Sequence, residues 1–189
     1  MIKKLKSLGF FQYGKIIPGL TIHSKAALYP VLNERAIRAG AGIMFIVGLF
    51  AFFQAFYLDE FIFIKVFVSV FFFDFFMKVV VGTKFSPVSQ LANLIVSKQA
   101  PEYVGAVQKR FAWSIGLFLS SIMIIMLFVL GVQGLPNLIV CGTCLSFMFL
   151  ETSFGICVGC KIYNYLVGIK IISTSDYKPA CPSNVCSIE

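Results

Sequence analysis

Residues 61–81 read FIFIKVFVSVFFFDFFMKVVV, and this stretch decides the class of the fold. Only Lys65, Ser69, Asp74 and Lys78 interrupt its apolar run. A bilayer core of about 30 Å is crossed by roughly 20 mostly apolar residues in a helix. Lipid offers no partner for backbone amides, and the run is continuous rather than alternating, so a helix is expected and a barrel strand is excluded. The stretch therefore predicts a transmembrane helix.

The composition of the whole chain agrees with this prediction. Of the 189 residues, 59% are hydrophobic and 13% are charged, and the mean hydropathy is +0.91. A soluble domain would have about 45–50% apolar and about 25% charged residues. The composition thus excludes a water-soluble enzyme, a nucleic-acid-binding domain and a disulfide-stapled secreted module. The lone His23 has no evident partner for a Ser/His/Asp site, and no phosphate-binding loop is present.

Three more stretches are long and apolar enough to span a bilayer: about 41–58, about 111–131, and one that starts near Leu135. We therefore expect an all-α polytopic membrane protein with four transmembrane helices in a bundle. Its expected parts are an N-terminal segment (1–40), a transmembrane domain (41–170) and a tail (171–189). The first segment is expected to lie at the membrane surface or, alternatively, to be a solvated tail attracted to anionic lipid. The stretch SPVSQLANLIVSK (86–98) predicts a short amphipathic helix between the second and third spans.

The basic residues predict the orientation of the chain. The net charge is +8, and seven Lys and Arg precede the first span while four lie in the second connection. The first connection offers only Asp59 and Glu60, and the third, 132–137, has no charge. Because basic residues concentrate in cytoplasmic loops, both termini are expected in the cytoplasm. We expect no signal cleavage, since Gln12, Lys15 and Pro18 interrupt the region where a signal core would lie.

Glu151, Lys78 and Asp74 lie inside predicted spans, where ionisable groups are costly and are usually paired or functional. With a rise of about 1.5 Å per residue, Glu151 falls at the same depth as the other two. The sequence therefore predicts a contact between Glu151 and Lys78, with Asp74 one turn away and sharing the lysine. Such a cluster is either a structural ion pair that fixes helix register or a proton or ion relay.

Four cysteines form two C-x-x-C pairs, Cys141 with Cys144 and Cys157 with Cys160. In a soluble chain this spacing would suggest zinc. Here the intervening segment is apolar, and a straight helix would separate Cys141 from Cys157 by about 24 Å. We therefore expect no metal site, unless the helix breaks around 152–155 and folds back.

The inner pair, Cys157 and Cys160, is the candidate redox site. It lies at the expected cytoplasmic boundary beside Lys161, and a nearby cation favours the reactive thiolate. The outer pair, Cys141 and Cys144, is a second candidate dithiol near the opposite surface, where a disulfide can persist. The alternative for both pairs is that cysteine is simply a small, readily buried residue. Cys181 and Cys186 form a further pair in the tail.

Three blocks of the sequence carry a resemblance to a known family. They are Asn33-Glu34-Arg35 with Arg38, Gln108 to Ala112 (QKRFA) with Gly116, and Leu150-Glu151 with Phe154 to Cys160 (FGICVGC). In these blocks the chain resembles the bacterial membrane proteins known as domain of unknown function 4395. The resemblance implies a small multi-pass protein of the bacterial inner membrane, acting alongside thioredoxin-like or sulfurtransferase proteins. The outer CGTC and the tail CPSNVC are additions to the family pattern.

Three functions are compatible with these features. The first is thiol-disulfide or sulfur-compound handling through Cys157 and Cys160, with a quinone, a partner protein or helix movement needed for any relay across the membrane. The second is a non-enzymatic subunit whose Phe-rich faces pack against lipid or another membrane protein. The third is a small transporter in which thiols guide a metal ion or a sulfur anion. Whether the chain is an enzyme stays open, and no cofactor is required by any motif.

Overall fold

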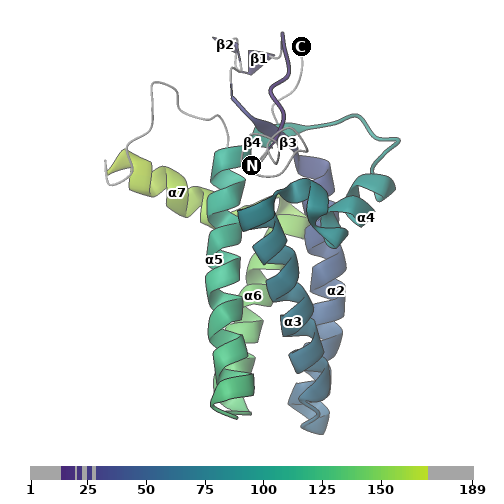
Figure 1. Ribbon diagram of the computed structural model, residues 1–189, viewed down its shortest axis with the longest axis vertical. Coiled ribbons are helices and arrows are strands. Elements are labelled where there is room, and N and C mark those ends of the chain that lie inside the picture. Colours follow the sequence, from purple (N-terminus) through teal and green to yellow (C-terminus); the bar gives the residue numbers. More distant parts are fainter. Residues whose placement is uncertain (1–13, 20, 23–24, 27–28, 170–189) are drawn as a thin grey trace, which may run out of the picture.

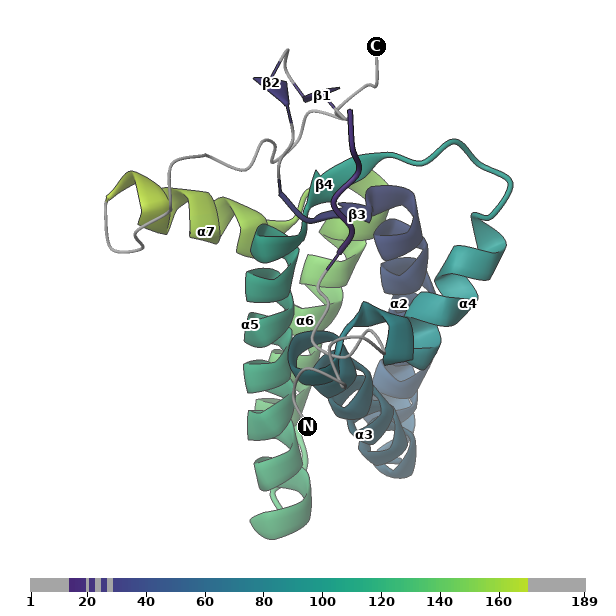
Figure 2. The ribbon, with the colours of Figure 1, turned by 45° about the horizontal axis from the view of Figure 1, so that its top comes forward.

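Four long helices stand side by side in the computed structural model, which describes residues 14–19, 21–22, 25–26 and 29–169 (Figure 1). Two shorter helices lie at one end of this bundle (Figures 1 and 2). The long helices are α2 (Glu34–Leu58), α3 (Ile62–Phe76), α5 (Ala106–Ile124) and α6 (Leu135–Phe154), and the short ones are α4 (Pro87–Ile95) and α7 (Val158–Gly168). Short segments η1 (Met77–Val81) and η3 (Ile125–Val129) continue α3 and α5 as π-helix, and η2 (Thr83–Phe85) is a 3-10 turn.

The described part of the chain is mostly helical, as predicted, and three of the helices in it are long and apolar enough to cross a membrane. These are α2, α5 together with η3, and α6. Large apolar side chains cover their outer surfaces, among them Ile46, Phe50, Phe118, Phe128 and Ile139. In water such surfaces would be costly, whereas in a bilayer they meet lipid tails. The exposed faces are therefore consistent with a lipid environment.

The core of the bundle forms where aromatic residues of α3 meet small residues of its neighbours. Phe67 packs against Gly48 of α2, where an added Cβ would lie 2.6 Å from the phenyl ring. Phe75 fills the space beside Gly116 of α5 in the same way. Small residues at helix contacts let backbones and rings approach closely, which stabilises helix pairs in membranes. These two contacts fix how α3 sits between α2 and α5.

A two-stranded antiparallel sheet joins the starts of α2 and α5. Strand β3 (Val31–Asn33) pairs with β4 (Tyr103–Gly105), with Leu32 opposite Val104. A second small pair, β1 (Thr21–Ile22) with β2 (Lys25–Ala26), precedes it. The sequence predicted neither pair, because the strands are too short to show alternation. The sheet matters for function because it places the first turns of two helices next to each other.

Helix α2 begins at Glu34, ahead of the predicted start of the first span at Ala41. The side chain of Asn33 caps it by accepting a hydrogen bond from the backbone N–H of Arg35. Arg35 also donates to the carboxylate of Glu102 through Nε at 2.8 Å. The predicted span began only after the charged residues Glu34, Arg35 and Arg38. The cap from Asn33 and the ion pairs allow these residues to lie within the helix. The expected N-terminal segment 1–40 therefore includes the first two turns of α2.

The predicted amphipathic helix is present as α4, and Asp74 anchors it. Ser86 caps α4, and its hydroxyl donates to the carboxylate of Asp74 at 2.6 Å. The backbone N–H of Val88 donates to the same oxygen at 3.2 Å. The other oxygen of Asp74 lies 2.7 Å from Nζ of Lys78. Asp74 thus holds the start of α4 against α3.

Candidate functional site

Helix α6 ends where Gly155 turns the chain sideways. Gly155 has φ +65°, in the left-handed region that favours glycine, and its backbone N–H bonds to Glu151 at the helix end. The guanidinium of Arg38 from α2 occupies the space that a Cβ at Gly155 would need. The stretch from Leu135 is therefore two helices, α6 and α7, and α7 leaves the bundle at a steep angle (Figure 1).

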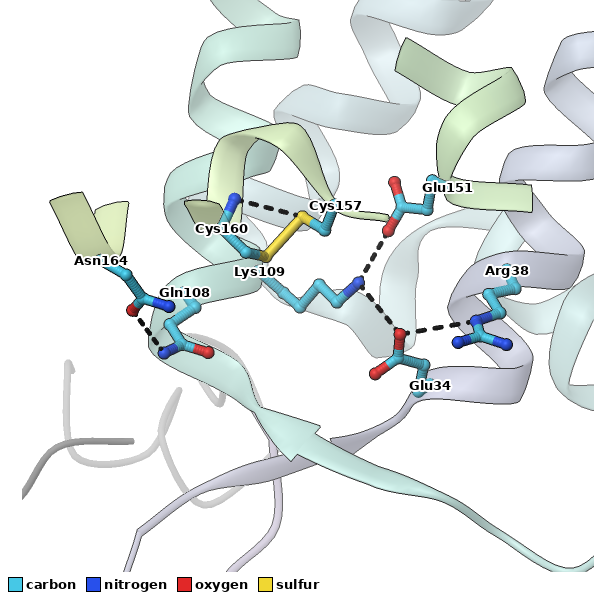
Figure 3. The surroundings of a disulfide bond; sticks show 8 residues. All are labelled: Glu34, Arg38, Gln108, Lys109, Glu151, Cys157, Cys160 and Asn164. Carbon is cyan, nitrogen blue, oxygen red and sulfur yellow. Dashed lines mark hydrogen bonds and ion pairs between the residues drawn. A yellow bond between two sulfur atoms is a disulfide. The ribbon is translucent and has the colours of Figure 1, made fainter. Parts of the chain in front are cut away.

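Cys157 and Cys160 form a disulfide across the first turn of α7 (Figure 3). Cys157 is the N-cap of α7, and its sulfur accepts a hydrogen bond from the backbone N–H of Cys160 at 3.3 Å. Both residues are buried, with 7% and 1% of their surfaces exposed. Between them, Gly159 touches α5 so closely that an added Cβ would lie 2.6 Å from Cα of Ala112. The glycine therefore allows the disulfide to pack directly against α5.

A buried lysine lies beside the disulfide and links three helices. Lys109, in the first turn of α5, is only 1% exposed. Its Nζ lies 2.7 Å from Oε1 of Glu151 on α6 and 3.8 Å from Oε1 of Glu34 on α2. Nε of Arg38 lies 3.5 Å from the same Glu34 oxygen (Figure 3). We call these four residues the charge network. It holds two cations and two carboxylates, so its formal charge is zero, which reduces the cost of burying each ion.

The predicted contact between Glu151 and Lys78 is wrong. Lys78 pairs with Asp74 on its own helix and lies over the rings of Phe75 and Trp113, while Glu151 pairs with Lys109. The depth estimate was sound, since Lys78 and Glu151 line the same pocket. The sequence prediction did not place Lys109 inside the bundle, because it counted Lys109 as a residue of the second connection.

The outer pair, Cys141 and Cys144, lies within α6 as two buried free thiols. The helix breaks at Gly155, but it does not bring these thiols into a four-cysteine site, because Cys157 and Cys160 bond to each other. Within the part of the chain that the structure describes, no group of three or more His, Cys, Asp or Glu side chains is placed to hold a metal ion. Cys181 and Cys186 lie outside the described residues.

Sequence reasoning missed Glu34, Arg38 and Lys109 as site residues. All three occur in the blocks that carried the family resemblance, and the structure brings those blocks together around the disulfide (Figure 3). Helical spacing offered a second signal for Lys109. Trp113 and Gly116 follow it by four and seven residues, so a helix that starts before Phe111 places all three on one face.

The fold and the site define a mostly helical protein with membrane-length apolar helices and a disulfide buried at one end of the bundle. The chain belongs to the family described as Domain of unknown function (DUF4395), whose profile matches residues 32–167. The matched range runs from β3 into α7 and includes the charge network and the disulfide. No curated protein and no solved structure matches the chain.

Replacing Lys109 with Met is expected to destabilise the protein by about 2–3 kcal/mol, less than for a fully buried pair, because it leaves the partly buried carboxylates of Glu34 and Glu151 without their central cation. Unfolding in mixed detergent micelles measures this loss. The double variant Lys109→Met with Glu151→Gln should recover part of it, since one uncompensated charge is then gone. An unchanged unfolding midpoint for Lys109→Met would show that the network contributes nothing to stability.

Replacing Gly155 with Ala is expected to destabilise the protein by at least about 1–2 kcal/mol, the cost of a left-handed non-glycine residue, with an added clash against Arg38. Gly168→Ala is the matched control, because that glycine lies at the end of α7 with open space where a Cβ would go. Thermal unfolding of both variants in the same detergent tests the difference. Equal midpoints would argue against the constraint at Gly155.

Proposed function

We propose that this protein is a membrane thiol-disulfide protein in which Cys157 and Cys160 cycle between a disulfide and a dithiol. The observation that carries the proposal is the position of the pair, with Cys157 as the N-cap of α7 and Cys160 in its first turn. The N-terminus of a helix has partial positive charge and free N–H groups. Both favour a thiolate, the form that takes part in disulfide exchange.

Hydrogen bonding to the sulfur supports the same function. In the oxidised state the N–H of Cys160 already points to Sγ of Cys157. The N–H groups of this turn remain available to a thiolate after reduction, so the site is prepared for both redox states. Cys157 is the proposed exchanging sulfur, because Cys160 is the more deeply buried of the two.

The charge network contributes to this function by positioning the pair. Glu151 lies in the last turn of α6, and Arg38 packs against Gly155, so the network holds both sides of the turn that leads to Cys157. Because the ions neutralise each other, they add little net field at the sulfur atoms. A change of Lys109 is therefore expected to act mainly on stability and on the position of α7.

The same features support a proposal for how the protein lies in the membrane. We propose that α3 with η1 is the fourth span, because it packs within the bundle and continues helically through residues 62–81. The disulfide end carries Lys84, Lys98, Arg110 and Lys161, which favours the cytoplasmic side of a bacterial inner membrane for this end.

Labelling with a membrane-impermeant maleimide tests this orientation. The maleimide should label Asp59→Cys in intact cells and Ser97→Cys only in opened membranes. The reverse pattern would contradict this orientation.

Trapping of thiols in cells tests the redox proposal. Acid quenching followed by alkylation and mass spectrometry should find Cys157 and Cys160 in both oxidised and reduced forms, and brief treatment with oxidant or reductant should shift their ratio. The double variant Cys141→Ala with Cys144→Ala should keep this shift under a soluble oxidant or reductant, because the outer cysteines are free thiols that are not bonded to the inner pair. A pair that stays in one form under both treatments would contradict the proposal.

A further inference from the structure

A narrow apolar groove runs between α5 and α6 and ends at the disulfide. Its walls include Gly116 and Leu119 of α5 and Cys144 and Phe147 of α6. Phe75 of α3 forms part of its floor. From Cys144 to Glu151 the wall extends seven residues along α6, which is about 10 Å. The groove is therefore elongated along the helices rather than across them.

The disulfide end of the groove differs chemically from the rest. Cys157 and Glu151 line it there, together with Trp113, while the remaining lining is apolar or aromatic. The cavity measures about 70 Å³, several times the space that a single water molecule needs. A molecule in the groove would thus place a polar, redox-active end at Cys157 and an apolar part between the helices.

Burial limits which partners can reach the disulfide. Cys157 is 7% exposed and Cys160 is 1% exposed, so a folded protein cannot dock directly on either sulfur without movement of α7. The groove offers Cys157 a route that lies between two helices long and apolar enough to span a membrane. A partner that uses this route must dissolve in lipid and must exchange two electrons with a dithiol.

We propose that the groove between α5 and α6 binds a lipid-soluble quinone, which exchanges electrons with the Cys157–Cys160 pair. This inference rests on the proposed redox function of the pair and names its membrane-side substrate. A flat quinone ring can stack on Trp113, which lines the disulfide end, and its apolar tail follows the groove past Phe75. The site would therefore recognise both parts of such a molecule.

The exchange balances without a further reactant. In the oxidising direction the two S–H bonds of the dithiol break and the S–S bond forms. The two electrons and two protons released pass to the quinone, which becomes a quinol. The reverse reaction reduces the disulfide. Glu151 lies on the groove wall, and one of its carboxylate oxygens accepts a hydrogen bond from Nζ of Lys109. A carboxylate is therefore present at the end of the groove where the thiol protons are released.

The test uses the full chain in detergent, reduced with dithiothreitol, freed of excess reductant and mixed with decylubiquinone. Quinone absorbance and thiol titration are followed together. We expect one quinone reduced for each Cys157–Cys160 pair oxidised, and no reaction in Cys160→Ser. Trp113 is the sole tryptophan of the chain, so quinone binding should also quench the protein's fluorescence saturably.

A pair of matched variants tests the groove itself. Leu119→Phe fills part of it, so less room is left for the quinone and the quinone reaction should slow by about tenfold or more. Phe118→Leu is the control, because Phe118 is 65% exposed and does not line the groove; it should react like the unaltered protein. If Leu119→Phe does not fold, Ile115→Phe narrows the same groove.

The outcomes separate this inference from the proposed function. A pair that exchanges with dithiothreitol and oxidised glutathione but not with decylubiquinone would overturn the quinone site and leave the redox function standing. Equal rates for Leu119→Phe and Phe118→Leu would also overturn the site. A disulfide that neither reagent nor quinone converts would overturn both.

Discussion

The arrangement of the disulfide end depends on one buried ammonium group, that of Lys109. A lysine at 1% exposure is stable only where carboxylates surround it, and here Glu151 and Glu34 do so from two other helices. Because Arg38 balances the second carboxylate, the network is neutral as a whole. The pairing fixes α2, α5 and α6 relative to one another at the level where the chain turns toward Cys157.

Two glycines position the cysteine pair next to this charge network. Gly155 stops α6 and accepts the guanidinium of Arg38 where any side chain would overlap it. Gly159 then brings the first turn of α7 against Ala112 of α5. The cysteines on either side of Gly159 are held at a helix N-terminus, next to an apolar groove on one side and buried ions on the other. The same turn thus combines structural constraint with the groups needed for thiol chemistry.

The sequence predicted the parts of the fold that depend on hydrophobicity and local capping. The long apolar runs gave the bundle helices, and Ser86-Pro87 followed by spaced apolar residues gave α4. The inner C-x-x-C pair was identified as the candidate site from its spacing and position. These features are local, so they can be recognised from neighbouring residues.

What the sequence did not show depends on contacts between distant segments. Lys109 looked like a loop residue because its carboxylate partners lie 42 and 75 positions away, at Glu151 and Glu34. The pairing of β3 with β4 brought the start of α2, with Glu34, next to the start of α5, and three-residue strands leave no pattern to read. The break at Gly155 was foreseen only as an alternative, and the contact that leaves room only for glycine there is made by Arg38 on another helix.

In the function proposed above, the Cys157–Cys160 disulfide is a redox group and not a fixed structural bond. Equilibration of the purified protein in glutathione buffers of stepped potential, with alkylation and mass analysis of the pair, tests it directly. For a redox pair we expect one reversible two-electron transition within the range of exchanging dithiols, about −270 to −120 mV. A pair that remains oxidised below about −300 mV, as structural disulfides do, would contradict it.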